Sequence, residues 1–131
     1  MEECLFCKII RGEIPSKTIY EDERVKVFLD ITPKVNGDLL IIPKKHTENI
    51  LTIDNETLLY IVKIIKEKIY PLLKEKLDAK GLTIIQNNEE IQEIKHFHFH
   101  VTPRKEDKDL EIKSDESLLK DLEEVYNILT K

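Results

Sequence analysis

The sequence predicts an α+β fold in which an antiparallel sheet of about five strands carries one long helix and a C-terminal helix. Two groups of β-patterned segments, within residues 18–42 and 82–102, support this fold, because a long helical pattern separates them and another follows. Strands that follow one another without a helix after each are typical of antiparallel sheets. The chain of 131 residues is long enough to bury its own core, so we expect one domain over residues 1–131.

The N-terminal part is predicted to contain a short helix and three strands. Apolar residues within 4–11 indicate one or two helical turns that end at Gly12. Residues 18–21 and 24–30 have the composition and alternation of strands. The continuous apolar run at 39–42 indicates a strand that is buried on both faces.

A long amphipathic helix is expected in the middle of the chain. Asp54 or Asn55 provides its N-cap, and apolar residues recur with the helical period from Leu58 onward. Pro71 is expected to kink the helix, because proline removes a hydrogen bond and clashes with the preceding turn. Gly81 is expected to end it.

The chain after this helix returns to the sheet and then forms a last helix. The expected segments are a strand, a polar loop and a second strand, at residues 82–86, 87–95 and 96–102. Ser114 or Asp115 is expected to cap a C-terminal helix over about residues 115–130, with leucines and a valine on one stripe.

The run His-Phe-His-Phe-His at residues 96–100 holds three of the four histidines. Alternate side chains of a strand share a face at intervals of roughly 6.6 Å, so His96, His98 and His100 face one side. Imidazoles titrate near neutral pH and serve as bases, nucleophiles or metal ligands, so this run predicts the working site. A neutral imidazole that donates from one nitrogen to a carbonyl can attack phosphorus with the other, which suits phosphoryl or nucleotidyl transfer.

Cys4 and Cys7 form a Cys-x-x-Cys motif. This spacing indicates half of a metal site or a redox pair, and the missing strand before it disfavours a thioredoxin-like arrangement. With His46 and one triad histidine, the cysteines would complete a tetrahedral shell for structural zinc. Spacing alone leaves zinc and two reduced thiols as equal alternatives. A catalytic zinc held by all three triad histidines is disfavoured, because they would span about 13 Å.

The charge pattern limits the partners. The net charge is −5 with both signs interspersed, which argues against an extended nucleic acid or an acidic membrane as partner. A small phosphorylated molecule is compatible with this pattern. No apolar run is long enough to span a membrane, and Met1–Glu3 lacks the features of a secretory signal. We therefore expect a cytoplasmic protein.

Several motifs together resemble the histidine-triad (HIT) family, in particular its nucleoside phosphoramidase-like branch. The similarity covers residues 4–104 and rests on residues 6–15, 20–22, 28–31, 42–46 and 96–104. The resemblance implies a homodimer whose sheets join across the interface and a purine nucleotide or nucleoside phosphoramidate as substrate. It implies that His98 attacks the α-phosphorus to give a covalent nucleotidyl-histidine, and that His100 contacts the phosphate and the leaving group.

Further family residues match positions of this chain. Asp30 matches the residue that holds the ribose hydroxyls, and Asn87 resembles a phosphate-contacting asparagine. The wall around the base matches Phe6, Ile9, Phe28 and Ile31. Zinc-containing relatives imply a structural Zn²⁺ held by Cys4, Cys7, His46 and His96. Asp30 and Asn87 also fit ordinary roles in turns, and the apolar residues also fit the core.

The loop before the triad departs from the family pattern. Relatives carry a glycine-rich Gly-Gln-Ser element there, whereas residues 88–95 contain no glycine, keep only Gln92 and have Glu93 in place of the serine. A carboxylate that faces a phosphate is repulsive, and strand alternation directs Lys95 away from the histidines. Two functions stay open: a nucleotide hydrolase or transferase with His98 as nucleophile, or a zinc-stabilised nucleotide-binding or interaction protein with little or no catalysis.

Overall fold

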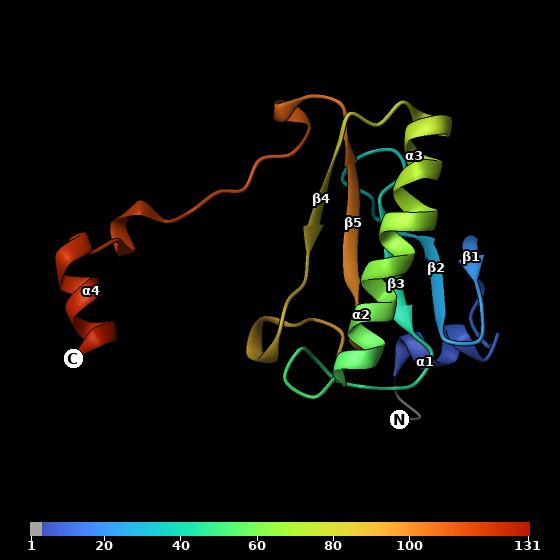
Figure 1. Ribbon diagram of the computed structural model, residues 1–131, viewed down its shortest axis with the longest axis horizontal. Coiled ribbons are helices and arrows are strands. Elements are labelled where there is room, and N and C mark those ends of the chain that lie inside the picture. Colours follow the sequence, from blue (N-terminus) through green and yellow to red (C-terminus); the bar gives the residue numbers. More distant parts are fainter. Residues whose placement is uncertain (1–3) are drawn as a thin grey trace.

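Five strands form one antiparallel sheet in the order β1-β2-β3-β5-β4 (Figure 1). The computed structural model describes residues 4–131, and the expectation for Met1–Glu3 lies outside them. The strands are Thr18–Glu21 (β1), Val25–Leu29 (β2), Leu39–Pro43 (β3), Gly81–Ile85 (β4) and Phe99–Arg104 (β5). All neighbouring strands pair antiparallel, which confirms the predicted α+β class and the number of strands.

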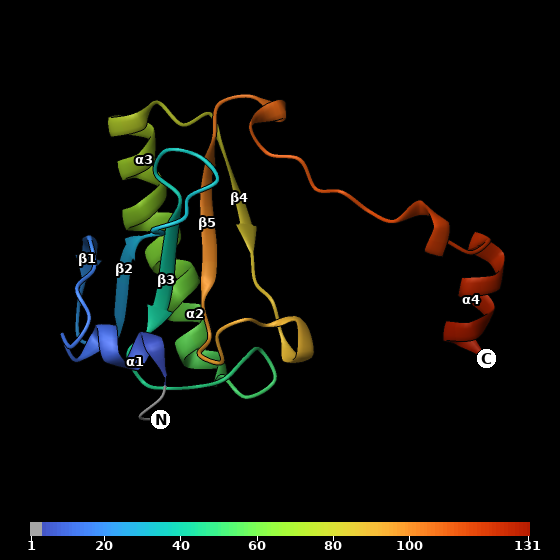
Figure 2. The same ribbon diagram turned by 180° about the vertical axis from the view of Figure 1, so that it is seen from behind.

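The long helix covers one face of this sheet, as the two opposite views show (Figures 1 and 2). Its N-cap is Asp54, as predicted, because the Asp54 Oδ2 accepts a hydrogen bond of 2.9 Å from the Thr57 amide. The helix consists of three consecutive parts: Asn55–Ile64 (α2), a π-helical turn at Ile65–Ile69, and Tyr70–Leu77 (α3).

The sequence predicts a kink at Pro71, and a π-helical turn lies just before this residue. Proline cannot donate a backbone hydrogen bond and its ring crowds the preceding turn, so a wider turn just before it relieves the clash. The predicted end at Gly81 is wrong. The helix ends at Leu77, because Asp78 adopts a left-handed backbone with φ +57°. Aspartate tolerates this conformation through local hydrogen bonds of its side chain, and Gly81 starts β4 instead.

Two apolar cores lie on opposite faces of the sheet. The strands alternate, so Val25 and Val27 of β2 enter the core under the long helix, whereas Phe28 enters the other core. The second core is closed by the short helix Leu5–Ile10 (α1), which packs at one end of the opposite face (Figure 2). Its buried members are Phe6, Ile9, Phe28, Leu40 and Ile42.

The C-terminal helix begins later than predicted. A 3₁₀ turn at Glu116–Leu118, capped by Asp115, precedes the helix Leu122–Thr130 (α4), and extended backbone at Leu119 separates the two. Both views show α4 away from the sheet (Figures 1 and 2). Its predicted apolar stripe is therefore exposed, with Leu122 84% and Leu129 79% accessible. Within residues 4–131, every helix is too short or too polar to cross a bilayer.

Candidate functional site: a histidine cavity beside a four-ligand cluster

Only the third triad histidine lies within a strand. The expected strand over residues 96–102 begins at Phe99 instead, so His96 and His98 precede β5. The alternation nevertheless holds, since Phe97 is fully buried under the long helix while both histidine rings contact Phe6 of α1 on the other face. Pairing with β3 stops at Phe99, and the Phe97 amide donates instead to the Thr47 carbonyl at 2.7 Å.

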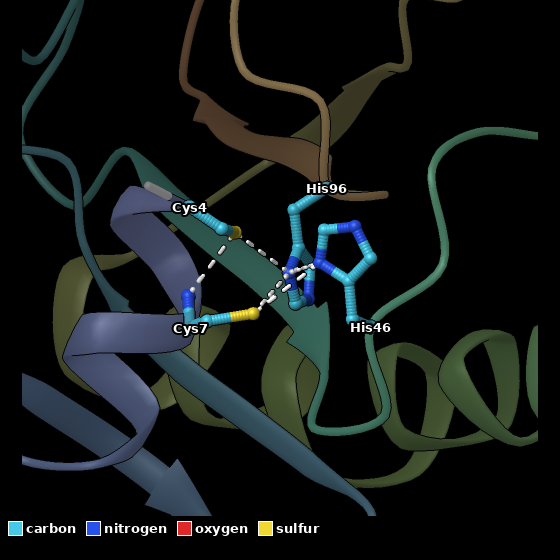
Figure 3. Close-up of side chains that lie close together, drawn as sticks. All are labelled: Cys4, Cys7, His46 and His96. Atoms are coloured by element: carbon cyan, nitrogen blue, oxygen red, sulfur yellow. Dashed lines mark hydrogen bonds between the residues drawn. The ribbon is translucent and has the colours of Figure 1, made fainter. Parts of the chain in front are cut away.

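Cys4, Cys7, His46 and His96 converge at the N-terminal end of α1 (Figure 3). Their ligand atoms all lie within 4.8 Å of one another. The His96 Nδ1 lies 3.4 Å from the Cys4 Sγ, 3.6 Å from the Cys7 Sγ and 3.2 Å from the His46 Nδ1. Ligands of a tetrahedral zinc ion lie about 3.3–3.8 Å apart, given bonds of about 2.0–2.3 Å. The spacing therefore fits one such ion.

A hydrogen bond outside the cluster orients the free lone pair of His96 inward. The His96 Nε2 donates to the Pro43 carbonyl at 2.8 Å, so the Nδ1 is left unprotonated and faces the other ligands. Burial lowers the pKa of His96 to about 4 and also lowers that of His46. Burial, together with Cys4, raises the pKa of Cys7 to about 11. Two thiols packed against the free Nδ1 lone pair of His96 and the Nδ1 of His46 fit a metal cation, which would stabilise the thiolates.

The other two triad histidines line a cavity of about 740 Å³. The His98 Nδ1 donates to the His96 carbonyl at 2.7 Å, which leaves the Nε2 lone pair free. The His98 and His100 rings lie 5.0 Å apart between centroids. Burial is the largest cause that lowers the pKa of each, and it favours neutral imidazoles. The hydrogen bond of the Nδ1 fixes the tautomer of His98, and its free Nε2 faces the cavity side of the sheet with His100.

Comparison with known proteins identifies the family. A family model described as the HIT domain matches residues 11–107. The chain belongs to the HIT family. It is 43% identical over 124 residues to a HIT-like protein of Methanocaldococcus jannaschii, covering 93% of this chain and 95% of the relative. It is 38% identical over 110 residues to the adenosine 5′-monophosphoramidase HNT1 of Candida albicans, covering 79% and 72%.

A solved structure of the family has the same fold. The Zn-bound histidine triad family protein of Mycobacterium smegmatis superposes with a TM-score of 0.79 at 34% identity, covering 87% of this chain and 84% of that one. The crystal structure of that protein is zinc-bound. In the present HIT chain, the cluster at the end of α1 is able to hold a metal ion.

The cavity beside His98 and His100 is lined by most of the site residues that were suggested from the sequence. The lining includes Phe6, Ile9, Phe28, Asp30, Ile31, Asn87, His98 and His100. Asp30 holds the turn after β2, because its Oδ1 accepts from the Thr32 amide at 2.9 Å and from the Thr32 hydroxyl at 3.2 Å. Ile31 is 90% exposed, so it lies at the rim, whereas Phe6, Ile9 and Phe28 are buried.

Gln92 lies apart from the cavity lining. It is 3% exposed, and its Nε2 donates to the carbonyls of Glu48 at 2.6 Å and Ile94 at 2.9 Å. These contacts tie the loop to the segment after His46. The geometry therefore makes Gln92 a loop anchor and does not bring it to the substrate. Glu93, the next residue, does line the cavity.

Sequence reasoning missed three polar residues of the cavity, Ser16, Thr32 and Lys34, of which only Lys34 is charged. Lys34 follows Pro33 in the turn between β2 and β3, and nothing in its local pattern distinguishes it from a solvated surface lysine. Lys95, which strand alternation was expected to direct away from the histidines, lies outside the lining and donates to the Glu89 carbonyl.

Proposed function

We propose that this protein is a nucleotide hydrolase or transferase that acts on the α-phosphate of nucleoside phosphoramidates or related nucleotides. The observation that carries the proposal is the His98 ring, with Nδ1 bound to a backbone carbonyl and Nε2 free in a cavity of about 740 Å³. Such a nitrogen is a competent nucleophile. The similarity to an adenosine 5′-monophosphoramidase supports this choice of substrate.

In the proposed reaction, the His98 Nε2 forms a bond to the α-phosphorus while the bond from phosphorus to the leaving amine breaks. The leaving amine takes up a proton that comes from solvent through His100, which lies beside His98. Water then cleaves the phosphorus–histidine bond and releases a nucleoside monophosphate. A neutral imidazole suits the nucleophile His98, and a neutral His100 can relay a proton by accepting it on one ring nitrogen while it donates from the other; burial lowers the pKa of both rings.

The remaining cavity residues have proposed roles in binding. The apolar side chains Phe6, Ile9, Phe28 and Ile31 would flank a purine base. Asp30 would accept hydrogen bonds from the ribose hydroxyls with its second oxygen, which has no hydrogen bond within residues 4–131. Asn87 would contact the phosphate with its side chain.

The metal cluster has a proposed structural role as a Zn²⁺ site. Cys4, Cys7, His46 and His96 would supply all four ligands, and a site without an open position is structural rather than catalytic. Bound zinc would attach α1 to the end of β3 and to the triad segment. Since α1 carries Phe6 and Ile9, the ion would hold the wall of the cavity in place.

A second candidate function is nucleotide binding without useful turnover, and Glu93 is the observation that favours it. Glu93 lines the cavity. Burial lowers the pKa of His98, and the negative charge of Glu93 is the smallest of the effects that oppose this shift. A carboxylate beside a phosphate opposes binding and attack. Release of AMP from adenosine 5′-phosphoramidate by the purified protein supports the first function, and AMP binding without any release supports the second.

We predict that Glu93→Gln raises turnover of adenosine 5′-phosphoramidate by roughly 3- to 10-fold. The substitution removes a like charge from the cavity, and exposure of Glu93 to solvent screens and limits the effect. Glu90→Gln is the matched control, because Glu90 is exposed in the same loop but does not line the cavity. Equal rates for the two variants would mean that Glu93 does not restrain catalysis.

We also propose that the protein forms a homodimer in which a second copy pairs along β4. β4 is an edge strand whose only neighbour within residues 4–131 is β5, and its Ile84 side chain is 46% exposed. Unpaired backbone groups on a regular edge favour strand addition. The other edge, β1, has an irregular register between Thr18 and Tyr20 and is a poorer template.

Ile84→Glu is expected to shift the protein from dimer to monomer at micromolar concentration. The added charge would be buried without a partner in the joined sheet. Analytical ultracentrifugation measures the change. Ile19→Glu on β1 is the matched control, since Ile19 is 39% exposed at the opposite edge. A monomeric wild-type protein, or a dimer that survives Ile84→Glu, would contradict this interface.

A further inference from the structure

We propose that Lys34 binds the substrate phosphate and replaces the hydrogen-bond donors that the glycine-free loop at residues 88–95 lacks. This inference rests on the proposed function, because it names the group that would hold the phosphate in the same cavity. Lys34 lines the cavity together with His98 and His100. It comes from the turn between β2 and β3, whereas the altered loop comes from the segment before β5.

The charges around the cavity require a cation if a phosphate is to bind. Asp30 and Glu93 contribute two carboxylates to the lining, and Lys34 is the only lysine or arginine among the described residues that line it. A phosphate placed among carboxylates alone would be repelled, and partial burial strengthens the repulsion. Lys34 is therefore the group that makes the cavity suitable for an anion.

A buried carboxylate fixes Lys34 relative to the triad strand. Asp38 is fully buried, and its Oδ2 accepts from the Lys34 amide at 3.0 Å. Its Oδ1 accepts from the Thr102 hydroxyl at 2.7 Å. Thr102 lies two residues after His100 on β5, so both side chains point to the same face of the sheet. The turn that carries Lys34 is thus tied to the strand that carries His100.

The Lys34 ammonium group remains available to a ligand. Its Nζ lies 3.6 Å from the Asp38 Oδ2, longer than a good hydrogen bond, and the side chain is 40% exposed. That oxygen already accepts from the Lys34 amide. The charge of Lys34 also acts on His100. Burial lowers the pKa of His100 most, and His98 and Lys34 lower it further.

The altered loop offers no substitute cation. Lys95, its only lysine, donates to the Glu89 carbonyl at 2.5 Å and lies outside the lining. Glu89 itself adopts φ +60°, a left-handed conformation that glycine accepts without strain and glutamate does not. The loop therefore keeps a backbone suited to glycine, but contributes the carboxylate of Glu93 to the cavity.

Binding of AMP and adenosine, measured by isothermal titration calorimetry, tests the proposal. Lys34→Met should weaken AMP binding by roughly tenfold or more, as expected for loss of a charged hydrogen bond. It should change adenosine binding by less than about twofold, because adenosine has no phosphate. Lys34→Arg should restore most of the AMP affinity. Lys63→Met is the control, since Lys63 is exposed on α2 and belongs to no ion pair within residues 4–131.

The outcomes separate the two proposals. Suppose that the wild-type protein binds AMP and adenosine. If Lys34→Met then weakens the binding of both compounds equally, or leaves the binding of both unchanged, the role of Lys34 is overturned while nucleotide binding stands. A loss of thermal stability with unchanged AMP affinity would show that Lys34 only neutralises Asp38. If the wild-type protein binds neither compound, the proposed function fails and the role of Lys34 fails with it.

Discussion

His98→Ala is expected to reduce turnover of adenosine 5′-phosphoramidate on the order of 10⁴-fold or more. The substitution removes the nitrogen that would form the covalent bond to phosphorus, and no other side chain of the cavity has a ring nitrogen in the same position. His98 makes one side-chain hydrogen bond, to the His96 carbonyl, so its loss leaves the sheet and the metal cluster intact. AMP binding should persist, because Lys34 and the apolar wall remain.

A reaction quenched with denaturant at alkaline pH and analysed by mass spectrometry distinguishes a nucleophile from a general base, because the phosphorus–nitrogen bond of a nucleotidyl-histidine hydrolyses in acid. The wild-type protein should carry a nucleotidyl adduct on His98, and His98→Ala should carry none. His100→Ala is the informative comparison, since it should slow turnover while the adduct still forms on His98. Undiminished turnover by His98→Ala, with zinc and fold retained, would end the covalent mechanism.

The parts of the site that the sequence could predict are those that local periodicity determines. The alternation of His96, His98 and His100 with phenylalanines is a property of extended backbone, and it persists although β5 begins only at Phe99. The strand start shifts because the Phe97 amide bonds to Thr47 rather than to β3. The convergence of Cys4, Cys7 and His46 with His96 required the resemblance to the family, because spacing alone left free thiols as an alternative.

The features that the sequence could not predict depend on contacts between distant segments. Lys34 reaches the cavity because Asp38 bonds to Thr102, sixty-four positions away in the chain. The Gln92 side chain donates to the carbonyl of Glu48, forty-four positions earlier in the chain, and this hydrogen bond directs it away from the cavity. The end of the long helix was misplaced for a different reason, since Asp78 adopts the left-handed backbone for which glycine is the usual residue.

Replacement of Cys4 and Cys7 by serine together is expected to remove about one zinc per chain and to destabilise the protein on the order of 3 to 5 kcal/mol. A chain of this size should then melt roughly 10–20 °C lower. The reason is that α1 has only six residues, too few for a stable isolated helix, so its attachment depends on the cluster and on the second core. Metal analysis of protein purified without added zinc, followed by calorimetric melting, measures both effects.

Chelation separates the metal from the packing of the sulfur atoms. Cys7 is buried, so serine also costs some stability in the absence of any ion. If zinc is responsible, a chelator should lower the melting temperature of the wild-type protein to near that of the double variant and should leave the variant unchanged. AMP affinity should fall in parallel, because a detached α1 removes Phe6 and Ile9 from the cavity. His98→Ala should keep its zinc, since His98 contributes no ligand atom to the cluster. Zinc that stays bound after both cysteines are replaced would rule out this ligand set.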